Sequence, residues 1–298
     1  MDKYFFENEL TSSQVAKSVS SKSAKKRVLA AVSEHVTSKD LASLSKDTNS
    51  GVRYCVAANA KTSSKILNEL SKDSSVDVRM AVAQNPSTPD EVLKILSADD
   101  LPTVREMVAL NPHTSLEILK KLSKDKVTRV RVSVAENANT TKDILAALYV
   151  DTDKSFQEAL STHPNTPLEI IVKLSKSKDE FIRGNIAERR DLPENILEAL
   201  AKDKEDWVRR LLAENPTIPQ SVIDLLSKDK DSLVREALIG NSSSLVDDSI
   251  EVENSDSVKL ALASNFNTPL EILTELAKNQ EVAFLDGSFK SIRATVGK

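Results

Sequence analysis

The residues best suited to chemistry in this sequence are few and lie in separate stretches of the chain. The histidines are His35, His113 and His163, and Cys55 is the single cysteine. One cysteine cannot form an internal disulfide or a cysteine-based metal cage. No histidine is placed in the sequence to activate it as a nucleophile. Glycine-rich phosphate loops and the HExxH and GxSxG motifs are absent from the sequence. The sequence therefore predicts no enzyme, no bound metal and no cofactor.

The composition points to helices rather than sheets. The chain has 298 residues, only 5 glycines and 4 % aromatic residues, a balance that suits helices. The formal net charge of −4 lacks the basic excess expected of a protein that binds nucleic acid backbones. No apolar leader and no run of 18 apolar residues occurs in the sequence. A cytoplasmic location is the expectation that follows.

A repeat of 26 residues organises the chain. The string "VRMAVAQNPSTPDEVLKILSADD" at 78–100 returns as "VREMVALNPHTSLEILKKLSKDK" 26 residues later. Taking the arginine of each Val-Arg pair as the start gives ten units, which begin at 27, 53, 79, 105, 131, 157, 183, 209, 235 and 259. We expect an N-terminal cap half-repeat over 1–26, a ten-repeat solenoid over 27–280, and a C-terminal cap or tail over 281–298.

Each unit predicts two short helices. In the unit at 79, Val78 and Val82 fall on one helical face with Ala83 beside them, and the second helix carries Val92, Leu93 and Leu96 inward. Such helices cannot bury their apolar faces alone, whereas stacked neighbours bury a continuous core. The fold class predicted is therefore an all-α solenoid.

The turn between the two helices carries the strongest local signals. Asn85 is expected to end the first helix in the left-handed conformation, with Pro86 after it unable to continue the helix. Thr88 then reads as the N-cap of the second helix, with Pro89 at its first position and Glu91 completing a capping box. The pairs Thr114/Glu117, Thr166/Glu169 and Thr268/Glu271 repeat that box. Near the start, "TSSQ" at 11–14 predicts another.

An aspartate lies six residues before most of the repeated arginines, as Asp99 does before Arg105. An arginine row could grip phosphates. The alternative is a structural ladder of charge-assisted hydrogen bonds between stacked units. Because the acid accompanies the base almost every time, we favour the ladder and expect the Asp99 carboxylate to pair with Arg105.

With these features in view, the unit at 78–100 resembles the leucine-rich repeat variant family, and the Asp–Arg spacing is similar to the ladder of HEAT repeats. The resemblance implies a right-handed solenoid of short paired helices with a binding role. Some family members carry a cysteine-ligated iron–sulfur cluster, which a chain with only Cys55 does not take over. A second similar group is the HEAT-like alkylpurine DNA glycosylases, of which Trp207 with Asp206 and Arg209 offers a faint echo.

One candidate partner surface lies on the outward positions of the first helices. Tyr54, Met80 and Leu110 are apolar there, together with Val28, Val32, Ala58 and Val132. An exposed apolar stripe commonly marks a contact. The alternatives are that Tyr4, Phe5 and Phe6 fold back over the stripe, or that the superhelix buries it.

A second candidate surface lies where the repeat pattern breaks. Gln157 replaces the repeated arginine, His163 replaces the turn asparagine, and Arg189-Arg190 replace an Asn-Pro pair. We expect a local basic site for an acidic protein segment or a phosphate, built from His163, Arg189, Arg190, Trp207 and Arg210, with Arg183 and Arg209 nearby. The alternative is an ordinary salt-bridged surface, neutralised by Glu188, Asp191, Glu205 and Asp206.

The function predicted from these features is a non-enzymatic interaction scaffold that binds a protein or peptide along its superhelical surface. The alternative is a nucleic-acid-binding HEAT-like solenoid related to the alkylpurine DNA glycosylases. Retention on duplex DNA with a steep salt dependence would favour that alternative.

Overall fold

The computed structural model of the chain describes residues 10–149, 153–241 and the single positions 262, 268, 271, 272 and 274. Over these ranges the regular structure is α-helical. Three predictions lie outside the described residues: the fold-back of Tyr4, Phe5 and Phe6, most of the last two units, and the segment 281–298. The chain divides into two compact units, 1–166 and 167–298, which are described separately.

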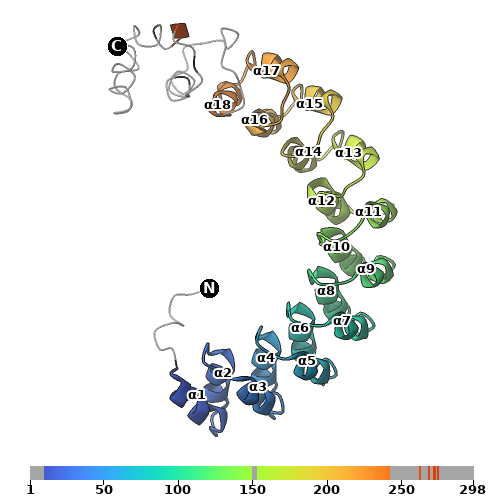
Figure 1. The fold of residues 1–298 in the computed structure, drawn as a ribbon. Helices are drawn as coiled ribbons and strands as arrows, with labels where there is room; N and C mark the ends of the chain where they lie inside the picture. The colour runs from blue at the N-terminus through green and yellow to red at the C-terminus, as the bar shows by residue number, and fades with distance from the viewer. Residues whose placement is uncertain are drawn as a thin grey trace. The chain divides into compact units, whose positions relative to one another are not determined.

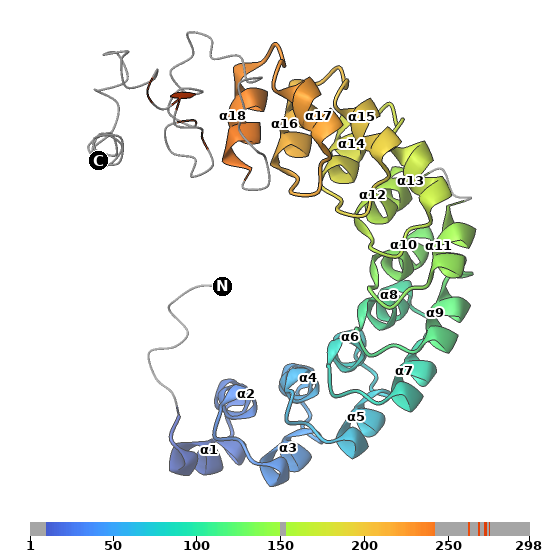
Figure 2. The same ribbon diagram turned by 45° about the horizontal axis from the view of Figure 1, so that its top comes forward.

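The first compact unit begins with α1 (Ser12–Val19) and continues as stacked helix pairs. The first helices of the pairs are α2 (Ala24–Val32), α4 (Ser50–Ala58), α6 (Val76–Gln84), α8 (Pro102–Leu110), α10 (Thr128–Glu136) and α12 (Lys154–Thr162). The second helices are α3 (Ser38–Leu44), α5 (Ser64–Leu70), α7 (Asp90–Leu96), α9 (Leu116–Leu122) and α11 (Lys142–Leu148). First helices lie side by side in one row and second helices in another, as Figures 1 and 2 show.

The second compact unit repeats the same arrangement. Its first helices are α14 (Glu180–Ala187), α16 (Asp206–Glu214) and α18 (Ser232–Gly240), and its second helices are α13 (Leu168–Leu174), α15 (Glu194–Leu200) and α17 (Gln220–Leu226). The two rows of short helices make each compact unit an α-solenoid, as the repeat predicted.

The core lies between the two rows and is made by the predicted positions. Val78, Val82 and Ala83 of α6 are fully buried, and Val92, Leu93 and Leu96 of α7 are nearly so. Burying a leucine or valine side chain contributes about 1.5–3 kcal/mol relative to leaving it in water. A buried alanine at the position of Ala83 recurs in most first helices and lets the neighbouring helix approach closely; α12 has Ser161 there and α18 has Ile239.

Asn85 is the C-cap residue that ends helix α6, as predicted, but the left-handed conformation predicted for this residue is wrong. Asn85 has φ −67° and ψ 125°, which is extended rather than left-handed, and no described non-glycine residue has a positive φ. Its side-chain amide instead donates to the carbonyls of Ala57 at 2.6 Å and Asn59 at 3.0 Å in the preceding repeat. The bond to an alanine carbonyl of the preceding repeat recurs at Asn59, Asn111, Asn137, Asn215 and Asn241. Asparagine therefore ties one repeat to the next.

The capping box predicted at Thr88 and Glu91 is also wrong. Helix α7 begins at Asp90 with Pro89 as its N-cap residue and without a side-chain cap. The Thr88 hydroxyl donates to the carbonyl of Val82 at 2.6 Å, so it satisfies the end of the first helix rather than the start of the second. Thr62, Thr114, Thr140, Thr166 and Thr268 make the equivalent bond. The capping box of Thr11 and Gln14 on α1 is confirmed.

Candidate partner-binding surfaces

The repeated arginines and aspartates form a ladder, with a different pairing from the one predicted. The Asp99 carboxylate accepts from Arg79, 20 residues earlier, with Nε to Oδ2 at 2.6 Å and Nη2 to Oδ1 at 3.2 Å. Arg105 instead donates from Nη1 to the backbone carbonyl of Asp99 at 2.7 Å. The turn after α7 brings the aspartate back to the first helix of its own repeat, while its carbonyl faces the next one. Each aspartate thus joins two arginines through different atoms.

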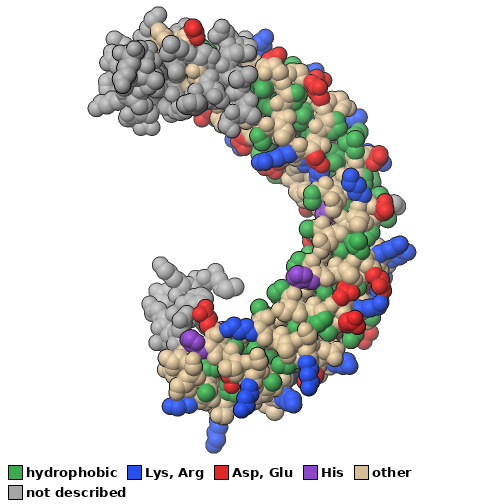
Figure 3. All heavy atoms as spheres, viewed as in Figure 1, with side chains coloured by type: hydrophobic (Ala, Val, Ile, Leu, Met, Phe, Trp, Pro, Cys, Tyr) green, Lys and Arg blue, Asp and Glu red, His purple; other side chains and the backbone are tan. Residues whose placement is uncertain are grey.

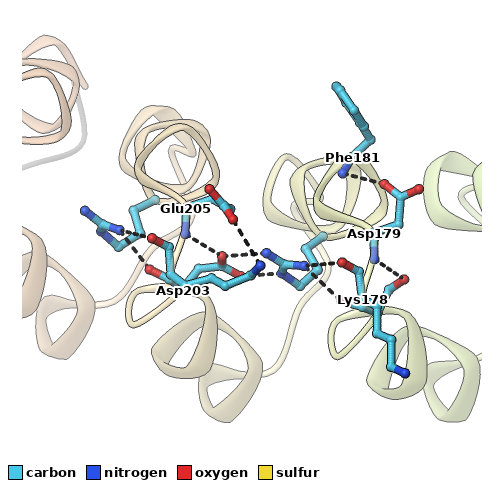
Figure 4. A network of polar contacts seen from close by, with 9 residues as sticks. Lys178, Asp179, Phe181, Asp203 and Glu205 are labelled. Atoms are coloured by element: carbon cyan, nitrogen blue, oxygen red, sulfur yellow. Dashed lines mark hydrogen bonds and ion pairs between the residues drawn. The ribbon is translucent and has the colours of Figure 1, made fainter.

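This geometry recurs along both compact units. Its further pairs are Arg27–Asp47, Arg53–Asp73, Arg105–Asp125, Arg183–Asp203 and Arg209–Asp229, and Figure 4 shows the ladder around Asp203. Hydrogen bonds from the Arg53 guanidinium hold the pKa of Asp73 below its ordinary value. Because these guanidinium groups are largely buried and already paired, they form a structural ladder and not a row that grips phosphates.

The apolar stripe predicted on the first helices is present at the surface of the first compact unit. Tyr54 of α4 and Leu110 of α8 are exposed, and Met80 of α6 is half-buried. Val32 of α2 and Ala58 of α4 are exposed as well, whereas the predicted Val28 and Val132 are half-buried. Leu29 of α2, which was not predicted, is exposed. We call Leu29, Val32, Tyr54, Ala58, Met80 and Leu110 the apolar face. Figure 3 shows hydrophobic side chains reaching the surface along this row.

Three outward positions of the repeat carry no charge over three successive first helices. The second, third and sixth positions carry no acid or base on α2, α4 or α6, and Gln84 is the polar side chain among them. Exposed Lys25 of α2 and Asp77 of α6 lie one turn before these positions, and on α8 Glu106 forms an ion pair with Arg129 of α10 at 2.5 Å. An exposed apolar row of this kind favours an apolar ligand over a polyanion.

The basic cluster predicted around Arg189 is not formed. Arg189 is buried and makes a bidentate pair with Asp191 at 2.9 and 2.7 Å. Arg183 and Arg209 belong to the ladder and are buried as well. Only Arg190 and Arg210 of the predicted arginines are exposed. The prediction failed because Arg189 stands at the position of the turn asparagine, which points into the solenoid.

His163 also lies inside the solenoid rather than on a binding surface. It is buried at the turn-asparagine position, with Nε2 placed 2.9 Å from the carbonyl of Asn137. Its Nδ1 accepts from the backbone N–H of Asn165 at 3.0 Å, so Nε2 carries the proton and donates to Asn137. The imidazole thereby substitutes for an asparagine amide, and its predicted contact with a partner is withdrawn.

Trp207 has a different environment from the one predicted. Its ring lies over Gly184 of the neighbouring first helix, where a Cβ atom would come within 2.5 Å of the ring. The ring also contacts Phe181, with centroids 5.5 Å apart and an angle of 46° between the planes. Phe181, Trp207 and Leu233 occupy the same repeat position in α14, α16 and α18, a 26-residue spacing that was visible in the sequence and was missed. We call these three residues the aromatic row.

Comparisons with known proteins find a similar helical repeat. Residues 76–101 match the family model described as leucine rich repeat variant. This match covers one repeat unit of the chain. A solved structure described as a leucine-rich repeat variant with a novel repetitive protein structural motif is similar to this chain at 22 % identity, over 75 % of this chain and 88 % of that one, with a TM-score of 0.54. This likeness shows the fold. None of the curated proteins matches the chain.

Within the described part of the chain, no group of three or more His, Cys, Asp and Glu side chains could hold a metal ion. Cys55 is half-buried on α4, and burial raises the pKa of its thiol, which disfavours the reactive thiolate. No helix among the described residues is long and apolar enough to cross a membrane.

Proposed function

We propose that this chain is a non-catalytic scaffold whose apolar face binds an apolar segment of a protein partner. The observation that carries the proposal is the row of apolar side chains from Leu29 to Leu110 on the first helices, most of them exposed. Tyr54 and Leu110 are exposed to water. When a partner covers them, the free energy of binding becomes more favourable by about 25 cal/mol for each Å² of apolar surface buried.

The spacing of the row suits a helical partner. Adjacent packed helices lie about 8–10 Å apart, so successive repeats present one apolar patch at about that interval. Seven residues of an α-helix rise about 10.5 Å. An amphipathic helix lying across the row would therefore place one apolar side chain on each repeat, which is the helix-in-groove form of recognition.

The nucleic-acid alternative draws little support from this surface. Phosphate binding depends on accessible cations, whereas the ladder arginines are occupied by aspartates and the apolar face has no base on α2, α4 or α6. The resemblance of Trp207, Asp206 and Arg209 to a DNA glycosylase site is also poorly supported. Arg209 forms an ion pair with Asp229 at 2.6 Å and is therefore not available to a phosphate.

Photo-cross-linking tests the proposal in cells. A benzoylphenylalanine placed at position 54 or 110 lies on the apolar face, and one placed at position 95 lies on α7 in the other row. The three native side chains are matched in exposure, at 42 % for Tyr54, 41 % for Leu110 and 46 % for Ile95. We expect positions 54 and 110 to cross-link to one protein, position 95 to give none of it, and Val32→Glu to abolish the product at 54.

Two results would contradict the proposal. Equal cross-linking from position 95 would mean that exposure alone, and not the apolar face, determines the contact. Nucleic acid as the captured species would favour the alternative function. Circular dichroism of Val32→Glu provides the folding control, because Val32 is exposed and its substitution should leave the helices intact.

A further inference from the structure

The aromatic row of the second compact unit, Phe181 and Trp207 with Leu233, places large apolar side chains at the surface. These residues belong neither to the arginine–aspartate ladder nor to the fully buried core. Phe181 is 61 % exposed and Leu233 is 48 % exposed, while Trp207 between them is half-buried. The same repeat position in the first compact unit carries Lys25, Gly51, Asp77, Thr103, Arg129 and Ser155. Large apolar side chains thus occupy this outward position in three successive repeats only where the second compact unit begins.

Trp207 is held in a defined place instead of projecting freely. Gly184 gives it a flat seat, because any side chain there would collide with the ring at 2.5 Å. Phe181 then packs against the ring at 5.5 Å. A pair of rings fixed in this way loses little side-chain entropy when a ligand settles on it, which favours affinity.

Each ring follows an acidic residue in the chain. Glu180 precedes Phe181, and Asp206 precedes Trp207 and is exposed. Arg183 and Arg209 attract these two carboxylates electrostatically, but their side-chain hydrogen bonds go to Asp203 and Asp229. Arg210, one turn after Asp206, is exposed as well. Glu205 is bridged to Lys204 at 3.1 Å, which leaves Glu180 and Asp206 as carboxylates additional to the paired groups.

Aromatic faces beside carboxylates recognise cations. An arginine or lysine side chain can lay its apolar stem and its charge on a ring while its N–H groups donate to a neighbouring carboxylate. We propose that Phe181 and Trp207, with Glu180 and Asp206, form a site for an arginine or lysine of a basic partner segment. Leu233 takes an apolar residue of the same segment. This reverses the charge preference that the sequence suggested for Trp207, and it does not depend on the apolar face of the first compact unit.

The chain reports on this site directly, because Trp207 is its only tryptophan. Three peptides without tryptophan or tyrosine serve as probes: acetyl-(Arg-Leu)₃-amide, the same peptide with citrulline for arginine, and the same peptide with glutamate. We expect the arginine peptide to change Trp207 emission saturably, the citrulline peptide to bind at least tenfold more weakly, and the glutamate peptide to leave the emission unchanged.

Variants separate the proposed contacts from general effects. Asp206→Asn and Glu180→Gln should each weaken the arginine peptide about tenfold, and together more. Asp77→Asn is the matched control, because Asp77 is an exposed carboxylate in the first turn of α6, and it should change nothing. Gly184→Ala should displace the ring and alter the emission of the free protein. Leu110→Glu should leave this binding intact, whatever it does to the apolar face.

Several outcomes would overturn the proposal. These are equal affinity for the citrulline and arginine peptides, tighter binding of the glutamate peptide or of a thymidine oligonucleotide, and no saturable change in Trp207 emission. Calorimetry with the same peptides detects binding that does not change Trp207 emission. If Asp77→Asn lowered the affinity for the arginine peptide as much as Asp206→Asn does, the effect would come from net charge and not from this site.

Discussion

The carboxylate of Asp99 offers the sharpest test of how the repeats are joined. Asp99→Ala removes both side-chain bonds to Arg79, at 2.6 and 3.2 Å. The bond from Arg79 to the Asp73 carbonyl at 2.8 Å stays. The backbone carbonyl of residue 99, which Arg105 uses, is also untouched. The variant therefore removes the carboxylate bonds of one arginine, together with the bond that Asp99 Oδ1 accepts from the backbone N–H of Leu101 at 3.0 Å.

The magnitude follows from the burial of the pair. A hydrogen bond to a charged group contributes about 1.5–3 kcal/mol net, and removing one partner of a fully buried ion pair costs about 3–5 kcal/mol. The Arg79 side chain is 17 % exposed and that of Asp99 is 9 % exposed, so water compensates the orphaned guanidinium in part. We expect a loss of about 2–3 kcal/mol in the free energy of unfolding.

Urea denaturation followed by circular dichroism measures the loss, and hydrogen exchange of the α6 and α7 amides localises it. Asp100→Ala is the control, because this adjacent carboxylate is exposed and its removal should stay within about 0.5 kcal/mol. Double-mutant cycles then measure which arginine interacts with the Asp99 carboxylate. The coupling free energy of Asp99→Ala with Arg79→Met should exceed that with Arg105→Met. The pairing would be refuted if Asp99→Ala and Asp100→Ala destabilised the chain equally little, or if the two coupling energies had the reverse order.

Three further predictions concern the other bonds of the repeat. Asn111→Ala should destabilise the chain by about 1–3 kcal/mol, because its amide donates to two buried carbonyls at 2.6 and 3.2 Å; thermal melting against Asn139→Ala, an exposed turn asparagine, checks this. Thr88→Val should cost about 1 kcal/mol through the lost bond to Val82, whereas Glu91→Ala should be neutral; the opposite ranking would restore the capping box. Acid should also weaken the ladder: hydrogen bonds from Arg53 lower the pKa of Asp73, so its contribution is complete above the ordinary aspartate pKa of about 3.9 and is lost as the pH falls through the lower folded-state pKa. Urea midpoints between pH 6 and 3 should fall less steeply in Asp73→Asn than in the parent chain.

The architecture was predictable because it depends on periodicity. Val78, Val82, Leu93 and Leu96 repeat at helical spacing inside a 26-residue period, and burial follows from that spacing alone. The turn was not predictable by the same means. Local rules assign an Asn-Pro and a Thr-Pro pair to helix ends and caps, yet the partners of Asn85 and Thr88 are carbonyls supplied by the preceding repeat and by the preceding helix.

The ladder shows how a correct pattern can carry a wrong pairing. Each aspartate lies six residues before one arginine and 20 residues after another, and the two spacings sum to one repeat. From the sequence alone, the arginine that is nearer along the chain is the expected partner of the carboxylate. The fold assigns the carboxylate of Asp99 to Arg79 and its carbonyl to Arg105, so both spacings are used by different atoms.

Departures from the repeat have consequences that depend on which way the position faces. At the inward turn position, His163 and Arg189 replace asparagine and are absorbed by the solenoid, His163 through Asn137 and Arg189 through Asp191. At the outward position of α14 and α16, Phe181 and Trp207 replace small or polar residues and reach the surface. Gly184 accompanies them as the seat that Trp207 requires. An inward substitution must satisfy a buried partner, whereas an outward one is free to meet a ligand. The outward departures are therefore where a partner's specificity should be sought.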